Sequence, residues 1–188
     1  INQVNKETNG DAVVVSDVGQ HQMFTVRYAD FTTTRSNVTS GGLGTMGFAL
    51  PAAIGAKMGA PEREVVAFIG DGGYQMTCQE LGTILQTKAA VKIVVLNNEF
   101  LGMVRQWQQL FFEKRYASTE MTNPNFVKLA EAYDIKATKV VKREDLAGAV
   151  KEMIASKDSY FLEVMIEKED NVFPMVPTGA SVSEVRLS

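Results

Sequence analysis

The sequence predicts an α/β fold, in which a mostly parallel six-stranded sheet lies between two layers of helices. Short apolar runs rich in β-branched residues alternate with helical patterns along the chain. These runs are continuously apolar, which is typical of parallel strands that are buried on both faces. The chain has 188 residues, 45% of them hydrophobic, and no repeat divides it. We therefore expect one three-layer α/β/α domain over residues 1–188.

The expected strands are short runs of mainly apolar residues. AVVV, EVVAFI, KIVVLN and YFLEVMI are the clearest, and SNVTS is the weakest because it is polar. We place strands near residues 12–15, 37–39, 64–69, 92–97, 137–141 and 160–166.

The expected helices fill the intervals between these strands. The chain starts on helical sequence that Gly10 closes, and Pro124 after Asn123 predicts a helix with Asn as cap and Pro at its first position. Residues 176–188 read as a surface tail. The other helices are expected near residues 20–27, 46–59, 75–88, 101–112, 124–133 and 143–156.

Composition excludes several classes of function. The net charge is -3 and the basic residues are scattered, so we expect no nucleic-acid partner. The longest apolar stretches are too short to span a membrane. The single Cys78 permits no internal disulfide, which fits a cytoplasmic location. Because the chain begins abruptly at Ile1, we expect a domain excised from a longer protein.

The loops after four predicted strands carry the candidate site. In open parallel sheets, ligands bind beyond the carboxyl ends of the strands. Each of these loops is rich in glycine or small polar residues, so we expect them to form one shared site. They cover residues 16–21, 40–47, 70–75 and 97–102.

Asp71 and Asn98 are the candidate ligands of a metal ion. Asp71 lies between glycines after one apolar run, and Asn98 follows 27 positions later, after the next. A carboxylate beside a phosphate cradle requires a cation, and Mg²⁺ commonly takes one or two carboxylates together with phosphates and water. The alternatives are a helix cap for Asp71 and a turn for the asparagines.

Gly42 to Gly47 spell G-x-G-x-x-G before a helical pattern, which gives a rival hypothesis. Such a glycine run is typical of dinucleotide-binding Rossmann units, which also need an acid about 20 residues later. Glu62, Glu64 or Asp71 could supply that acid. The polar strand before the glycines argues against a buried first strand.

The remaining candidates have two interpretations each. Met103, Trp107, Leu110 and Phe111 fall on one helical face, which indicates either core packing or the wall of a pocket. His21 is either a donor to phosphate or a structural histidine. Cys78 is interpreted as a small buried apolar residue.

Taken together, these motifs resemble the thiamine diphosphate enzymes, and most closely the catalytic subunit of acetolactate synthase. The resemblance covers the whole chain and corresponds to the C-terminal third of that enzyme. The segments that carry it are SDVGQHQM, TSGGLGTMGFALPAAIGAK, GDGGYQMTCQELGT, LNNEFLGMVRQWQQLFFEKRYAST and PMVPTG.

The resemblance implies a role for each matching residue. Asp71 and Asn98 would bind Mg²⁺ through their side chains, and Phe100 through its carbonyl. Met46 would support the bent cofactor from below. The cofactor diphosphate and ring system would lie against Val18, Gly19, Gln20, His21, Gly44, Gly70, Gly72 and Gly73, and the substrate channel against Gly102, Met103 and Trp107.

The same resemblance implies the activity and the missing parts. The full enzyme would condense two 2-oxo acids with loss of CO₂, giving 2-acetolactate from pyruvate or 2-aceto-2-hydroxybutyrate when 2-oxobutyrate is the acceptor. It would carry FAD on a middle domain and act as a dimer or tetramer with a small regulatory subunit. The glutamate that activates the cofactor belongs to an absent N-terminal domain, and Glu80 and Glu99 do not match it.

We therefore expect no catalytic residue in this chain and no synthase activity from the chain alone. Three alternatives stay open. The chain could belong to another thiamine diphosphate enzyme, such as a pyruvate oxidase, glyoxylate carboligase or 2-oxo acid decarboxylase. It could also be a non-catalytic module of the same fold, or an NAD-binding unit.

Overall fold

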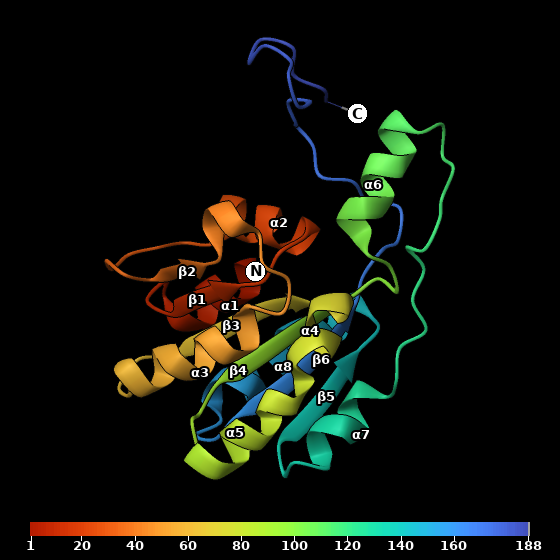
Figure 1. Cartoon of the computed structure of the whole chain (residues 1–188). Coiled ribbons are helices and arrows are strands. Elements are labelled where there is room, and N and C mark those ends of the chain that lie inside the picture. The colour runs from red at the N-terminus through yellow and green to blue at the C-terminus, as the bar shows by residue number, and fades with distance from the viewer. Residues whose placement is uncertain (188) are drawn as a thin grey trace.

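The computed structural model describes residues 1–187 and contains one six-stranded sheet (Figure 1). The strand order is β2-β1-β3-β4-β6-β5, and every neighbouring pair is parallel. The predicted fold class is therefore confirmed, with a sheet that is wholly parallel. The strands are β1 (Val13–Ser16), β2 (Asn37–Thr39), β3 (Val65–Gly70), β4 (Lys92–Asn97), β5 (Lys136–Val140) and β6 (Tyr160–Met165).

Eight α-helices within residues 1–187 connect and cover these strands. Short 3₁₀ turns at Gly41–Leu43, Cys78–Glu80 and Arg143–Asp145 precede or interrupt them. The helices are α1 (Asn2–Thr8), α2 (Gln20–Tyr28), α3 (Ala49–Gly59), α4 (Asp71–Thr77), α5 (Leu81–Thr87), α6 (Gly102–Phe111), α7 (Phe126–Glu131) and α8 (Leu146–Ala155).

The sheet is buried on both faces because successive side chains of each strand point to opposite sides. On β3, Val65, Ala67 and Ile69 join a core with residues of α3, α4, α5 and α7. Val66 and Phe68 join the opposite core with residues of α1 and α8. Continuous apolar runs in the sequence thus correspond to strands between two helical layers, as predicted.

The strand order brings the carboxyl ends of β1, β3 and β4 together. β1 connects to the edge strand β2, and the chain then returns to β3 on the other side of β1. This reversal is the position at which open α/β sheets bind ligands. On β3 and β4, Gly70 pairs with Leu96, so the residues after both strands start at the same level.

Three helix starts differ from the sequence predictions. α4 begins at Asp71, four residues before the predicted start near residue 75, so Gly70–Gly73 is a strand-to-helix junction. α3 begins at Ala49, because Gly47 has a positive φ of 80°. α7 begins at Phe126, and its cap is Asn125, whose side chain accepts a hydrogen bond from the Lys128 N–H. Asn123 is not a helix cap, because its amide is bound elsewhere.

α6 and the C-terminal segment lie beyond the carboxyl edge of the sheet (Figure 1). Gln106 on α6 accepts a hydrogen bond from the Val172 N–H and donates one to its carbonyl, which joins the two segments. The expected tail is mostly exposed over residues 176–187, and the backbone of Arg186 in it pairs with that of Met175, the residue before it. Within residues 1–187, no helix has the length and apolar character that a membrane crossing requires.

Candidate functional site

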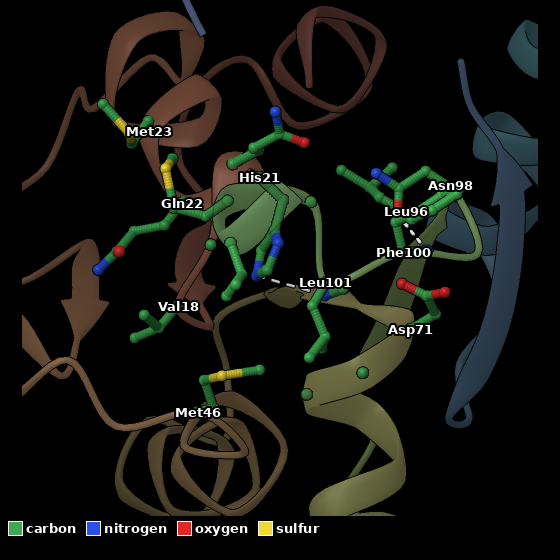
Figure 2. Close-up of a pocket in the computed structure, with 18 of the residues that line it drawn as sticks. Val18, His21, Gln22, Met23, Met46, Asp71, Leu96, Asn98, Phe100 and Leu101 are labelled. Atoms are coloured by element: carbon green, nitrogen blue, oxygen red, sulfur yellow. Dashed lines mark hydrogen bonds between the residues drawn. The ribbon is translucent and has the colours of Figure 1, made fainter. Parts of the chain in front are cut away.

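A cavity of about 310 Å³ lies at the carboxyl ends of β1, β3 and β4 (Figure 2). Every residue that the sequence assigned to the cofactor or the metal lines it, and so do Gly102 and Met103. Trp107 is not among its lining residues and lies in a neighbouring hollow that Met103 also borders. The cavity is further lined by residues without a predicted role: Gln22, Met23, Leu96, Leu101, Val104 and Ile166.

Asp71 and Asn98 lie on the same side of this cavity (Figure 2). Asp71 is the first residue of α4, and Asn98 follows β4 directly. Both are buried, with 1% and 5% exposure. The Asn98 side-chain oxygen accepts a hydrogen bond from the Phe100 N–H at 3.1 Å, so residues 98–100 form a compact turn. Tertiary structure thus brings to one cavity the two predicted ligands that the sequence separates by 27 positions.

The electrostatics of Asp71 favour a cation. Burial raises the pKa of its carboxyl above the ordinary value, and hydrogen bonds from Asn123 and nearby backbone N–H groups oppose that shift. Within residues 1–187, no lysine, arginine or histidine pairs with this carboxylate. A buried carboxylate beside an amide oxygen is a donor set that suits Mg²⁺, whose other ligands are usually phosphates and water. These residues therefore fit the predicted metal.

His21 is held at the base of the cavity in its neutral form. Burial lowers its pKa to about 4. The Gly70 N–H donates to Nε2 at 3.3 Å, which requires an unprotonated nitrogen at that position. A Cβ on Gly19 or Gly70 would approach the imidazole Cε1 to 2.9 Å, so both glycines allow the ring to pack closely. The imidazole therefore has a structural contact with β3, in addition to its place in the cavity.

Asp17 is a buried carboxylate next to the cavity-lining Val18 that our sequence analysis did not single out. It follows β1, is fully buried, and accepts hydrogen bonds from the Gly47 N–H at 3.0 Å and the Val18 N–H at 2.8 Å. Burial raises the pKa of its carboxyl, and the backbone N–H groups of Val18, Gly47 and Phe48 counteract this. Its contact fixes the loop of residues 40–47 to the end of β1. A carboxylate directly after a buried strand was a visible signal, because Asp71 has the same pattern.

The glycines at the start of α4 and α6 allow close packing between elements. A Cβ on Gly72 would lie 2.6 Å from Leu101 Cδ2, and one on Gly73 would overlap the Asp17 carboxylate. A Cβ on Gly102 would collide with the side chain of Gln20 and approach the Asn98 amide nitrogen to 2.8 Å. Side chains of other segments thus pack directly against the backbone at these glycines, and a larger residue there would force those side chains to move.

The side of the cavity opposite the metal candidates is mainly apolar, with one amide, Gln22, whose Nε2 donates to Thr39 Oγ1 at 2.9 Å (Figure 2). Val18, Met23 and Met46 lie there, away from Asp71 and Asn98 (Figure 2). Met46 follows Gly44, whose φ of 58° is in the left-handed region. A cavity with a polar, cation-favouring end and an apolar end suits a ligand that combines a phosphate with a ring system.

The dinucleotide hypothesis does not agree with this arrangement. The glycine loop from Gly42 to Gly47 follows β2, a three-residue strand at the sheet edge, and helix α3 starts only after it. Glu62 and Glu64 precede β3, which places them toward the amino ends of the strands, away from the cavity. Neither can serve as the acid of a Rossmann fingerprint. The third candidate, Asp71, follows β3, which β1 separates from the strand before the glycine loop.

A parallel α/β sheet with this cavity at its carboxyl edge defines a cofactor-binding domain. Comparison with protein families specifies the cofactor: the model described as "Thiamine pyrophosphate enzyme, C-terminal TPP binding domain" matches residues 17–164. The chain belongs to this family.

Relatives with curated names are similar to the chain along its whole length. Acetolactate synthase from Schizosaccharomyces pombe, named as mitochondrial, is 47% identical over 100% of the chain and 28% of its own length. The acetolactate synthase large subunit from Lactococcus lactis is 46% identical over 98% of the chain and 32% of its own length. The acetolactate synthase isozyme 2 large subunit from Escherichia coli is 45% identical over 98% of the chain and 34% of its own length. The chain thus spans about a third of these relatives.

A solved structure supports the fold assignment. The thiamine diphosphate-dependent 4-hydroxybenzoylformate decarboxylase of Rhodococcus jostii RHA1 superposes with a TM-score of 0.81 at 28% identity. The superposition covers 88% of this chain and 31% of that enzyme. The chain therefore corresponds to one domain of a larger enzyme of this class.

Proposed function

We propose that the chain binds thiamine diphosphate through Mg²⁺, held by the side chains of Asp71 and Asn98 and the carbonyl of Phe100. The buried Asp71 carboxylate, which has no cationic partner within residues 1–187 and lies beside Asn98, carries this proposal. An ion placed there would compensate the cost of burying the carboxylate.

The cofactor would extend from the metal end of the cavity to its apolar end. Gly72 and Gly73 would allow the diphosphate to approach the backbone, with Gln20 and His21 on its other side. Val18 and Met46 would contact the apolar ring system, and the Gly44 carbonyl would accept a hydrogen bond from it. Met103 and Trp107 on α6, with Gly102, would border the path of the substrate.

Within the whole protein we propose acetolactate synthase activity. Thiamine diphosphate supplies the carbanion chemistry by which CO₂ is removed from one 2-oxo acid and the remainder joined to a second. This chain would hold the cofactor in place and exclude water from it. The identities of 45–47% to acetolactate synthases favour this activity over that of other thiamine diphosphate enzymes.

The rest of the enzyme is part of the same proposal. FAD, the activating glutamate, a dimer or tetramer and a regulatory subunit would belong to the longer protein, and pyruvate and 2-oxobutyrate would be its substrates. We propose a cytoplasmic location, although the name of the fission-yeast relative places that protein in mitochondria. The chain alone should lack synthase activity.

Ligand-dependent thermal stability tests the cofactor proposal. We expect thiamine diphosphate with Mg²⁺ to stabilise the chain by about 2.7 kcal/mol at a ligand concentration about 100 times Kd. The cofactor without Mg²⁺, thiamine without its diphosphate, and NAD should have little effect. Asp71→Ala should abolish the stabilisation. Asp11→Ala, which removes a carboxylate two residues before β1, should preserve it. Equal stabilisation of the chain and its Asp71→Ala variant would contradict the proposal.

A further inference from the structure

Asn123 makes the side-chain hydrogen bond to the proposed metal ligand Asp71. Its Nδ2 donates to Asp71 Oδ2 at 2.7 Å and to Asn97 Oδ1 at 3.0 Å. Its Oδ1 accepts from Gln75 Nε2 at 2.8 Å. A flipped amide would place its oxygen against both of these acceptor oxygens and its nitrogen against the Gln75 donor, so the two acceptors and the one donor determine its orientation.

The amide contacts continue into the sheet as a buried network. Asn97 Nδ2 donates to Glu163 Oε1 at 2.8 Å, and Lys139 Nζ approaches the same oxygen at 2.9 Å. Asn97 and Glu163 are both 3% exposed. Strands β4, β5 and β6 thereby fix the position of Asn123, although Asn123 itself lies in the irregular connection between α6 and α7.

The same connection runs beside the third proposed ligand. The Leu101 N–H donates to the Thr119 carbonyl at 2.8 Å, and the Met121 N–H donates to the Glu99 carbonyl at 2.9 Å. This antiparallel pairing holds the backbone on both sides of Phe100 and does not use the Phe100 carbonyl. The segment of residues 119–123 thus contacts Asp71, which follows β3, and the backbone on both sides of Phe100, which follows β4.

We infer that the 119–123 segment positions the metal ligands, and that Asn123 sets the orientation of the Asp71 carboxylate. This inference rests on the proposed function. The hydrogen bond from Asn123 restricts rotation of the carboxylate and occupies one of its roughly four acceptor positions. Nearby backbone N–H groups also donate to this carboxylate, and the acceptor positions that remain face the cation. Removing a residue that hydrogen-bonds to a metal ligand typically lowers the metal affinity about 10- to 100-fold.

The test is the affinity of the chain for Mn²⁺, an oxygen-seeking substitute for Mg²⁺, measured by electron paramagnetic resonance with thiamine diphosphate in excess. We expect Asn123→Ala to raise the Kd for Mn²⁺ by about 10- to 100-fold. Asn125→Ala is the matched control, because Asn125 lies two positions away and caps α7. It should lower the melting temperature of the metal-free chain and leave the Kd unchanged.

Gln75→Ala provides a second variant that leaves Asn123 in place. Removal of its donor frees the Asn123 amide to rotate, so the Kd should rise in the same direction by a smaller factor. If Asn123→Ala does not fold, this variant decides: an unchanged Kd overturns the inference.

The outcomes separate the inference from the proposed function. An Asn123→Ala variant that loses thermal stability but binds Mn²⁺ like the unmodified chain shows a merely structural role and overturns the inference alone. If the unmodified chain binds no Mn²⁺ in the presence of thiamine diphosphate, the proposed function fails, and the inference fails with it.

Discussion

Replacing His21 with glutamine should reduce the loss of stability of the protein between pH 7 and pH 5. His21 is the single histidine of the chain, and burial lowers its pKa to about 4 from an ordinary value of 6.5. As the pH falls below 6.5, the unfolded chain gains a proton that the folded protein does not bind. Protonation therefore favours unfolding, and stability that is complete above pH 6.5 is lost as the pH falls toward 4.

The magnitude follows from the two pKa values. A folded-state pKa of about 4 against 6.5 in the unfolded chain gives a loss of about 2 kcal/mol at pH 5, and about 3 kcal/mol near pH 4. The hydrogen bond from the Gly70 N–H to Nε2 supports the direction, because a protonated ring could not accept it. Glutamine keeps an acceptor at this position and does not titrate.

Urea unfolding monitored by circular dichroism at pH 7, 6 and 5 measures this effect. The informative quantity is the difference between the two proteins in the slope of unfolding free energy against pH, since other groups titrate equally in both. Between pH 7 and pH 5, we expect the free energy of unfolding to fall by about 2 kcal/mol more for the unmodified chain than for the His21→Gln variant. Parallel pH profiles would refute the reasoning and show that the imidazole reaches solvent.

Two further predictions concern packing and buried polar contacts. Gly73→Ala should destabilise the protein by about 1 to 3 kcal/mol, because its Cβ would displace the Asp17 carboxylate from the Gly47 N–H. Gly148→Ala is its control: it lies on α8 with open space around it, and should stabilise by about 0.5 to 1 kcal/mol in the same thermal unfolding assay. Lys92→Met should cost about 2 to 4 kcal/mol in urea unfolding, since the buried ammonium donates to the Ser156 and Asp158 carbonyls beyond α8. A neutral outcome for Lys92→Met would mean that water replaces the ammonium.

The sequence predicted the sheet well because burial on both faces leaves a local pattern. The continuous apolar runs near residues 64–69 and 92–97 became β3 and β4 with shifts of at most one residue at either end. Helix starts were less accurate. The helix after β3 was expected to start near residue 75, but it begins at Asp71 and includes Gly72 and Gly73, against which Leu101 and Asp17 pack closely.

Asn123 illustrates what a local pattern cannot reveal. The pair Asn123–Pro124 predicted a helix cap, whereas the amide instead contacts Asp71 and Asn97, 52 and 26 positions away. The position of Asp17 after a buried strand was visible in the sequence, but its contact with Gly47, 30 positions away, was not. Each side chain had a plausible local partner in the sequence, and the fold supplied a distant one.

The sequence by itself determined the parallel α/β architecture and the placement of Asp71 and Asn98 after two buried strands, because periodicity and strand ends are local properties of the chain. Only the tertiary structure decided that these two residues share a cavity with His21 and that Asn123 contacts one of them. That outcome depends on strand order and on the path of the connection after α6, which are set by packing between segments far apart in the sequence.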